Sequence, residues 1–226
     1  MISLVLKSLN FTKKKLTVYP KESCTERILA LYDAYLEVIS NTNPMTLHFF
    51  DESSVIKTSG NRTYGHAPRG LNAVEFQRYA SNATFTINLL HGPLGVDYFN
   101  ILDGPSNGQN LVAFFLEAVQ ETDVNNQLKL QRGDTVVMDN CGFHHGRLTE
   151  AHLRQIFQLS GVSLLFQPPY HPQLNTCEHC FKSVKDYLKR YPDYCERFTE
   201  QAICDGVVEE ITPLKSLSFF KQCGYL

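Results

Sequence analysis

The order of short apolar runs and longer helical patterns constrains the fold of this chain more than any other feature. The runs that predict strands are residues 46–50, 84–90, 96–102, 135–138 and 162–166. The patterns that predict helices are residues 23–40, 110–120, 149–159 and 175–190, with Thr149 as the expected cap of the third. Two of the early strands form a hairpin around residues 92–95, and the later strands alternate with helices. We therefore expect an α/β fold, in which a mixed sheet is covered by helices on its faces.

The size and composition fit one globular domain. The chain has 226 residues, of which 43% are hydrophobic and 19% are charged. It has no apolar run near the roughly 18 residues that span a bilayer and no signal peptide pattern, so we expect an intracellular protein. Seven cysteines, an odd number, do not indicate a disulfide scaffold. The net charge of −2 argues weakly against a nucleic-acid partner, but the local distribution of charge matters more.

Two aspartates follow predicted strands directly. Asp51 comes after residues 46–50, and Asp139 comes after residues 135–138. Ligand sites form at the ends of strands in open α/β sheets, because side chains there leave the core and enter a crevice. A single aspartate in such a place is more often a turn former or a helix cap. Two of them, joined by a third carboxylate on a later helix, favour a site.

The third carboxylate is Glu178, in the first turn of the last predicted helix. Asn175 is the expected cap, so Asn-x-x-Glu could instead be a capping box without chemistry. Glu178 shares one helical face with three lysines, Lys182, Lys185 and Lys189. Such a face could place a metal ligand beside a track for phosphates, or it could be an ordinary solvated face with a Glu178–Lys182 pair.

Carboxylate oxygens are hard ligands that suit Mg²⁺ or Mn²⁺ better than zinc. Two such ions, about 3.5–4 Å apart, support phosphoryl transfer in many enzymes. In this hypothesis Asp51, Asp139 and Glu178 hold the ions and do not themselves transfer protons.

At these residues the sequence resembles the Tc/mariner superfamily of DDE transposases. The resemblance rests on four segments: residues 49–53 (FFDES), residues 137–140 (VMDN) with His144, residues 167–179 (QPPYHPQLNTCEH) and residues 64–70 (YGHAPRG). The third segment is long and specific, whereas the fourth is loose. The match runs from about residue 7 to the C-terminus.

The resemblance implies an RNase H-like fold with a mixed five-stranded sheet and helices on both faces. It implies a DNA transposase core that cleaves and transfers strands at transposon ends, with two Mg²⁺ or Mn²⁺ ions. The implied partners are double-stranded DNA, from the transposon ends and the target, and a second copy of the chain, in the nucleus of a eukaryotic host. The implied site consists of the metal ligands Asp51, Asp139 and Glu178, the supporting residues Asn140, His144 and Asn175, and the DNA contacts Arg69, Lys182 and Lys185.

The sequence departs from the family in three places. Thirty-eight residues separate the second and third carboxylates, a longer spacing than in the best-known members, and His66 stands where the family often has an aromatic residue. Residues 7–16 resemble only the end of the family's paired helix-turn-helix modules. We therefore expect a remnant of the DNA-binding region with a linker and a helix at residues 1–43, the catalytic domain at 44–195, and a C-terminal extension at 196–226.

Two other functions remain as alternatives. One is a domesticated or truncated copy that binds DNA without transposition, which the missing modules favour and the intact carboxylates oppose. The other is a zinc-dependent interaction domain built on Cys177 and Cys180 with nearby histidines and Cys195. A Cys-x-x-Cys pair within a helix has poor geometry for zinc, so we expect Cys177 to lie in the core and Cys180 to be partly exposed.

Overall fold

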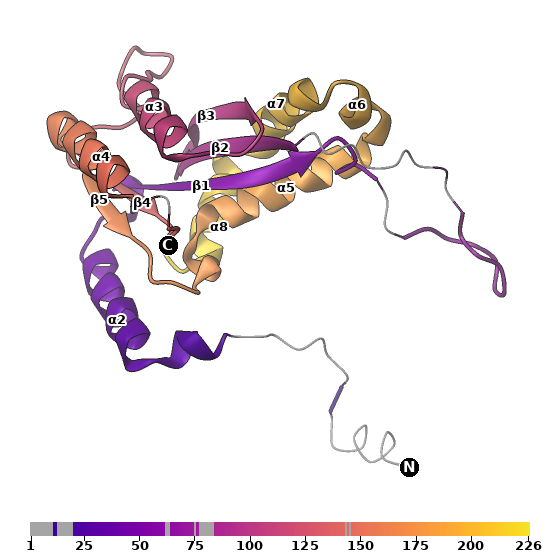
Figure 1. The fold of residues 1–226 in the computed structure, drawn as a ribbon, viewed down its shortest axis with the longest axis horizontal. Coiled ribbons are helices and arrows are strands. Elements are labelled where there is room, and N and C mark those ends of the chain that lie inside the picture. Colours follow the sequence, from indigo (N-terminus) through magenta and orange to yellow (C-terminus); the bar gives the residue numbers. More distant parts are fainter. Residues whose placement is uncertain are drawn as a thin grey trace.

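The computed structural model describes residues 11–12, 20–61, 64–74, 76, 84–142, 144 and 146–226. The expected helix-turn-helix remnant, residues 7–16, lies outside these residues except for two positions. The helices of the described chain are α2 (Glu26–Ser40), α3 (Gly108–Ala118), α4 (Arg147–Ser160), α5 (Thr176–Arg190), α6 (Pro192–Arg197), α7 (Thr199–Glu210) and α8 (Pro213–Gln222) (Figure 1). In the described residues, no helix combines the length and the apolar character needed to cross a membrane.

Five strands form one mixed sheet in the order β3-β2-β1-β4-β5. They are β1 (Leu47–Ile56), β2 (Thr84–Gly92), β3 (Gly95–Asp103), β4 (Thr135–Met138) and β5 (Ser163–Phe166). The first three pair antiparallel, and β4 and β5 run parallel to β1. The mixed sheet expected from the sequence is confirmed.

Helices cover both faces of the sheet. On one face α3 and α4 enclose a core that includes Phe50, Phe114 and Phe157. On the other face α5, α7 and α8 enclose a larger core that includes Phe49 and Phe220. Consecutive residues of β1 therefore enter opposite cores, as the alternation of side chains along a strand requires. Because α7 and α8 share the core with the sheet, residues 196–226 pack as part of the same body; the division at residue 195 stays a prediction.

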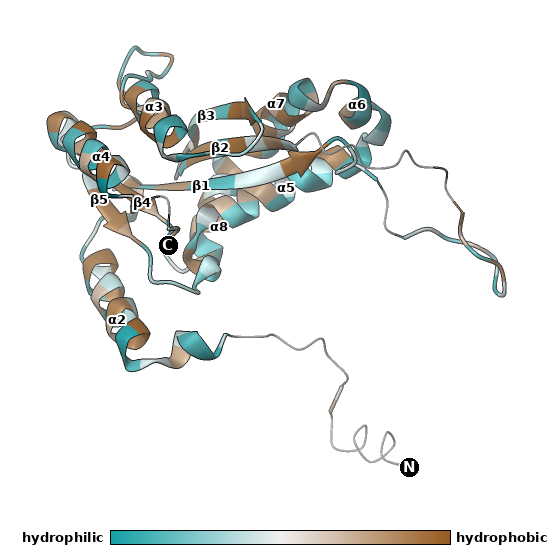
Figure 2. Cartoon of the chain, in the orientation of Figure 1, coloured by the Kyte–Doolittle hydropathy of each residue, from teal (hydrophilic) through white to brown (hydrophobic). Residues whose placement is uncertain are grey.

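Strand β1 continues past Asp51, where the sequence pattern predicted its end. It runs to Ile56 because its second half pairs with β2, where Ile56 lies opposite Thr84. The polar residues 51–54 interrupt the apolar colouring in the middle of the strand (Figure 2). The prediction that β1 ends before Asp51 was wrong, and Asp51 lies on a paired strand. Asp139, in contrast, follows the last residue of β4 as predicted.

Two smaller predictions were also wrong. Helix α4 begins at Arg147, after Gly146, and Thr149 is not its cap. Thr149 packs against the start of α3, where a Cβ on Gly108 would lie 2.2 Å from its Oγ1. Cys180 is fully buried instead of partly exposed, because α8 packs on this side of α5.

A buried histidine holds the strands together at the start of β1. His48 is 5% exposed, its Nδ1 lies 2.7 Å from Asp97 of β3, and its Nε2 lies 3.2 Å from Asp134, which precedes β4. Burial lowers the pKa of His48, but the two aspartates outweigh burial and raise it to about 9. The positive charge of His48 in turn helps to lower the pKa of His91 of β2, after burial, which is the largest cause. Lys129 donates to the carbonyl of Asp97 at 2.8 Å.

This cluster predicts that stability falls with rising pH. Below about pH 6.5 His48 is protonated in the folded and the unfolded chain, so its stabilisation is fully present. Between about pH 6.5 and 9 only the folded chain keeps the proton, and the free energy of unfolding falls by up to about 1.4 kcal/mol per pH unit. Urea unfolding of the reduced protein at several pH values, beside His48→Gln, measures this slope. Equal slopes for the two proteins would contradict the assignment to His48.

Candidate active site

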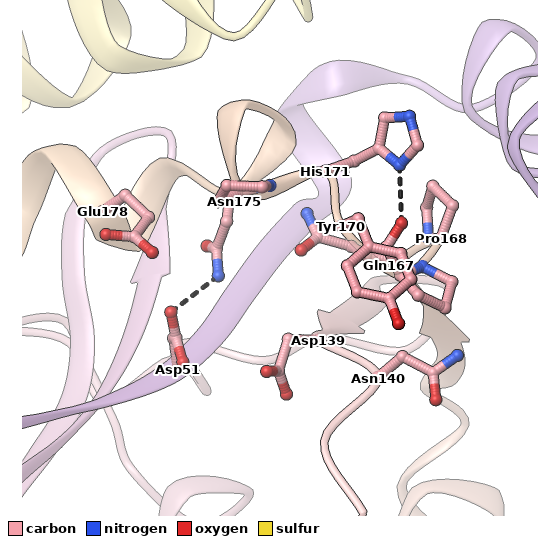
Figure 3. A pocket seen from close by; sticks show the side chains of 11 residues that line it. Asp51, Asp139, Asn140, Gln167, Pro168, Tyr170, His171, Asn175 and Glu178 are labelled. Carbon is pink, nitrogen blue, oxygen red and sulfur yellow. Dashed lines mark hydrogen bonds between the residues drawn. The ribbon is translucent and has the colours of Figure 1, made fainter. Parts of the chain in front are cut away.

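A pocket of about 300 Å³ brings the three predicted carboxylates together. Asp51 comes from the middle of β1, Asp139 follows β4, and Glu178 lies in the first turn of α5 (Figure 3). The predicted supporting residues Asn140 and Asn175 line the same pocket. The rest of the wall is the segment between β5 and α5, namely Gln167, Pro168, Pro169, Tyr170, His171 and Pro172.

The charged form of Asp51 is disfavoured in this pocket. Burial is the largest cause that raises its pKa well above the ordinary value, and the neighbouring charges of Asp139, Glu52 and Glu178 raise it further. Two groups donate to its carboxylate, the Glu52 amide at 2.8 Å and the Asn175 side chain at 2.9 Å. The site therefore favours a cation at Asp51, since a positive charge would offset both burial and repulsion.

His144 fixes the position of the Asp139 carboxylate. The Nδ1 atom of His144 lies 2.7 Å from Oδ1 of Asp139, and the amide of Cys141 donates to the same oxygen at 3.3 Å. His144 is buried, whereas the side chain of Asp139 is 41% exposed. His144 does not line the pocket, so it acts on the site through Asp139. Its carboxylate neighbours outweigh burial, which alone would lower the pKa of His144, and raise that pKa to about 10.

Glu178 does not take part in a capping box. The Asn175 side chain caps α5 by accepting from the backbone amide of Cys177 at 3.0 Å. The backbone amide of Asn175, however, donates to the carbonyl of Pro172 and not to the Glu178 side chain, as a capping box would require. The carboxylate of Glu178 is exposed at the rim of the pocket (Figure 3). The interpretation of Glu178 as a ligand at the pocket therefore has more support than the interpretation of Asn-x-x-Glu as a capping box.

The arrangement suits ions held by pairs of carboxylates. Within the residues that the structure describes, no three His, Cys, Asp or Glu side chains form a ready-made set of ligands for one ion. Mg²⁺ usually binds one or two carboxylates and completes its shell with water and substrate phosphates. Burial first, and then the charges of Asp139 and Glu178, raise the pKa of Asp51, so a cation bound at this carboxylate would relieve an unfavourable charge.

The loop between β5 and α5 forms one wall of the pocket and contains a residue with a strained backbone. Tyr170 has φ of 65°, in the left-handed region that non-glycine residues rarely adopt, and it is 46% exposed. Strain of this kind collects at functional sites. This loop belongs to the family motif of residues 167–179, which predicts no role for Tyr170 or Gln167, because a strained tyrosine cannot be recognised from sequence.

Buried hydrogen bonds fix the end of this loop next to the site. The carbonyl of Leu174, the residue before Asn175, accepts from the Gln167 side chain at 2.9 Å and from the Tyr225 hydroxyl at 2.5 Å. Tyr35 of α2 bonds to the same tyrosine at 2.7 Å. The segments near both ends of the described chain thus support the start of α5.

A second buried network secures the first turn of α5. His91 of β2 bonds to Thr176 at 2.8 Å and to Ser216 of α8 at 2.9 Å. Burial lowers the pKa of His91 to about 3, so the ring is neutral at pH 7 and links three elements without charge.

The three predicted DNA contacts lie in different environments. Lys182 is exposed on α5, one turn beyond Glu178. Lys185 is half-buried and donates to Ser53 of β1 at 2.7 Å. Arg69 is exposed in the segment that follows β1, which projects from the body, and it does not line the pocket (Figure 1). Their contact with DNA stays a prediction.

The cysteines and histidines near α5 do not form a zinc site. Cys177 and Cys180 are fully buried in the core, and Cys177 donates to the carbonyl of Phe49 at 3.2 Å. The rings of His171 and His179 stack on Tyr32 and Phe219, respectively. These four side chains therefore pack against different partners and do not surround a common metal position.

Asn175 has two roles that substitutions can separate. Asn175→Ala removes the cap of α5 and the bond to Asp51, so we expect a loss of about 1 kcal/mol in stability and a lower rate of any reaction at the pocket. Asn175→Ser keeps a capping oxygen but is too short to reach Asp51, so it should restore stability and not the rate. Thermal unfolding and a cleavage assay on the same preparations test this, and a fully active serine variant would contradict the role at Asp51.

Comparisons with known proteins agree with this geometry. Residues 46–198 match the family model of the DDE superfamily endonucleases. A comparison with curated protein sequences gives no match.

Three solved structures share the fold. The Mos1 transposase paired-end complex with left transposon end has a TM-score of 0.64 at 15% identity, over 99% of this chain and 70% of that one. A pre-cleavage Mos1 transpososome has a TM-score of 0.61 at 16% identity, over 100% and 71%. The Mos1 mariner paired-end complex with Mn has a TM-score of 0.61 at 16% identity, over 98% and 68%. The RNase H-like fold is confirmed. The family match covers most of the chain and includes all three carboxylates. The chain belongs to the DDE superfamily of endonucleases.

Proposed function

We propose that this chain is the catalytic core of a DNA transposase, which cleaves DNA at transposon ends and joins the freed end to target DNA. The observation that carries the proposal is the gathering of Asp51, Asp139 and Glu178 at one pocket of a DDE-family chain. The similarity to Mos1 complexes with transposon ends supports the substrate class.

Asp51, Asp139 and Glu178 would hold two Mg²⁺ or Mn²⁺ ions. When bound, such ions lower the pKa of an attacking water or 3′-hydroxyl and stabilise the leaving oxygen. The observation that favours this fit is the raised pKa of Asp51, a buried carboxylate with other acidic groups around it.

The remaining residues would position this set. Asn175 fixes one oxygen of Asp51 while it caps the helix that carries Glu178. His144 holds Asp139 on its loop, and Asn140 is exposed beside it at the pocket, where it can meet the substrate. Lys182 and Arg69, which are exposed, would contact phosphates of the DNA. Lys185, which is half-buried beside Ser53, would join them.

The partners of the chain follow from the substrate. Double-stranded DNA of the transposon end and of the target must both reach the pocket. A homodimer would allow two ends to be processed together, and the Mos1 transpososome and paired-end complexes support this assembly. Because the substrate is chromosomal DNA, we place the protein in the nucleus when the host is a eukaryote.

The test is cleavage of duplex DNA by the purified chain with Mg²⁺, with Mn²⁺, and with EDTA. We expect nicks that require the divalent ion and that disappear in Glu178→Gln, beside Glu37→Gln on α2 as a matched control. DNA binding without cleavage in both ions would overturn the proposal and favour a DNA-binding protein derived from a transposase.

A further inference from the structure

Two consecutive carboxylates of β1 face opposite sides of the sheet. Asp51 faces the α5 side, where Asn175 donates to it. Glu52 faces the α3 and α4 side, where it meets His144. The site described above uses Asp51 only, so Glu52 is an acidic group, 12% exposed at its side chain, that still needs a role.

Glu52 and Asp139 lie at the two ends of one buried ring. The Nε2 atom of His144 lies 3.1 Å from Oε1 of Glu52, and its Nδ1 atom lies 2.7 Å from Oδ1 of Asp139. A ring that donates from both nitrogens to carboxylates cannot rotate without losing one of the two bonds. Phe50 further confines the ring, with a centroid distance of 6.0 Å.

The side chain of Asp139 needs a restraint of this kind because of its position in the chain. This residue lies one position beyond β4, so the pairing of the sheet does not fix its side chain. Asp51, in contrast, is fixed by strand pairing with Leu89. The relative position of the two carboxylates therefore depends on a tie between β1 and the loop after β4, and Glu52 with His144 supplies one.

We infer that Glu52 is a positioning residue for the metal site, which acts through His144 to set the place of the Asp139 carboxylate relative to Asp51. The inference rests on the proposed function, because it takes Asp51 and Asp139 as a shared set of ligands. It makes Glu52 a residue that touches neither ion nor DNA. Side chains that orient metal ligands from outside the ligand set typically change metal affinity or activity by about 10- to 100-fold when they are removed.

Glu52→Ala and Glu52→Gln give the first test on the full chain. We expect Glu52→Ala to weaken Mn²⁺ binding, measured by titration calorimetry without DNA, by about 10-fold or more. The amide oxygen of Glu52→Gln can still accept from Nε2, so that variant should bind Mn²⁺ within a few-fold of the wild type. Thermal unfolding of the metal-free proteins checks folding, with Glu37→Ala on α2 as the control. A Glu52→Ala protein that folds and binds Mn²⁺ like the wild type would overturn the inference.

A double-mutant cycle with His144→Ala separates a relay from an independent role. If Glu52 acts through His144, the Mn²⁺ affinity of the double variant should equal that of His144→Ala alone. Additive losses would show that Glu52 acts on the ions by another path, and would also overturn the inference.

The cleavage assay distinguishes this failure from failure of the proposed function. A wild type that neither binds Mn²⁺ nor cleaves DNA contradicts the proposed function itself. A wild type that does both, beside an unaffected Glu52→Ala, contradicts only the role of Glu52. In the expected result kcat for cleavage falls in Glu52→Ala by about 10- to 100-fold, and KM for DNA stays unchanged.

Discussion

Replacing Asp51 by asparagine is expected to lower the rate of metal-dependent DNA cleavage by more than about 100-fold, beyond the cost of removing an outer positioning group. The physical reason is that Asp51 shares the pocket with the other two carboxylates, and that burial first, and then these carboxylates, raise its pKa. An amide at this position removes the charge that would hold both ions. Single-turnover cleavage of duplex DNA in Mn²⁺ measures the loss.

Two controls accompany Asp51→Asn. Asp33→Asn removes a carboxylate of the same kind from the exposed surface of α2 and should leave cleavage unchanged. DNA binding by the Asp51→Asn protein should stay close to that of the wild type, because the predicted phosphate contacts are elsewhere. Cleavage by Asp51→Asn within 10-fold of the wild-type rate would remove Asp51 from the ligand set.

Phe50→Ala is expected to lower the free energy of unfolding by about 3–5 kcal/mol. The ring is fully buried between β1 and α3, with centroid distances of 5.0 Å to Phe114 and 4.9 Å to Phe115. Alanine would leave a cavity that these rings cannot fill without moving α3. Urea unfolding followed by circular dichroism measures the change.

The matched control for this substitution is Phe76→Ala. Phe76 is 100% exposed, so its removal should change stability by no more than about 0.5 kcal/mol. A Phe50→Ala protein that loses less than 1 kcal/mol would mean that the core of α3 and α4 can close around the missing ring. Such a result would contradict the tight packing described for that face.

The elements of the fold could be predicted because their periodicity is local. In α5, for example, Cys177, Phe181, Val184 and Leu188 recur at helical spacing, and all four are buried. The end of β1 could not be predicted, because residues 51–56 are a strand only through pairing with residues 84–89 of β2, which are distant in the sequence. Local patterns carry no information about such a partner.

The candidate site was predictable to a similar degree. The family motifs and the apolar runs before Asp51 and Asp139 predicted Asp51, Asp139 and Glu178, and the structure brings them to one pocket, although Asp51 lies within β1 and not at its end. The motif predicts no role for Glu52, because it assigns the metal to the neighbouring Asp51. Only the extended strand shows that Glu52 faces the other side of the sheet and meets His144. An interaction between two residues through a third, such as that of Glu52 with Asp139 through His144, has no fixed spacing in the sequence.

The hydroxyl of Tyr225 at the carbonyl of Leu174 has a consequence for shortened forms of this chain. A form that ended before Tyr225 would still contain Asp51, Asp139 and Glu178. It would nevertheless lack a buried anchor of the loop that leads to Glu178. Three intact carboxylates are therefore an incomplete criterion for a working site in related chains, and the presence of this tyrosine is a useful second one.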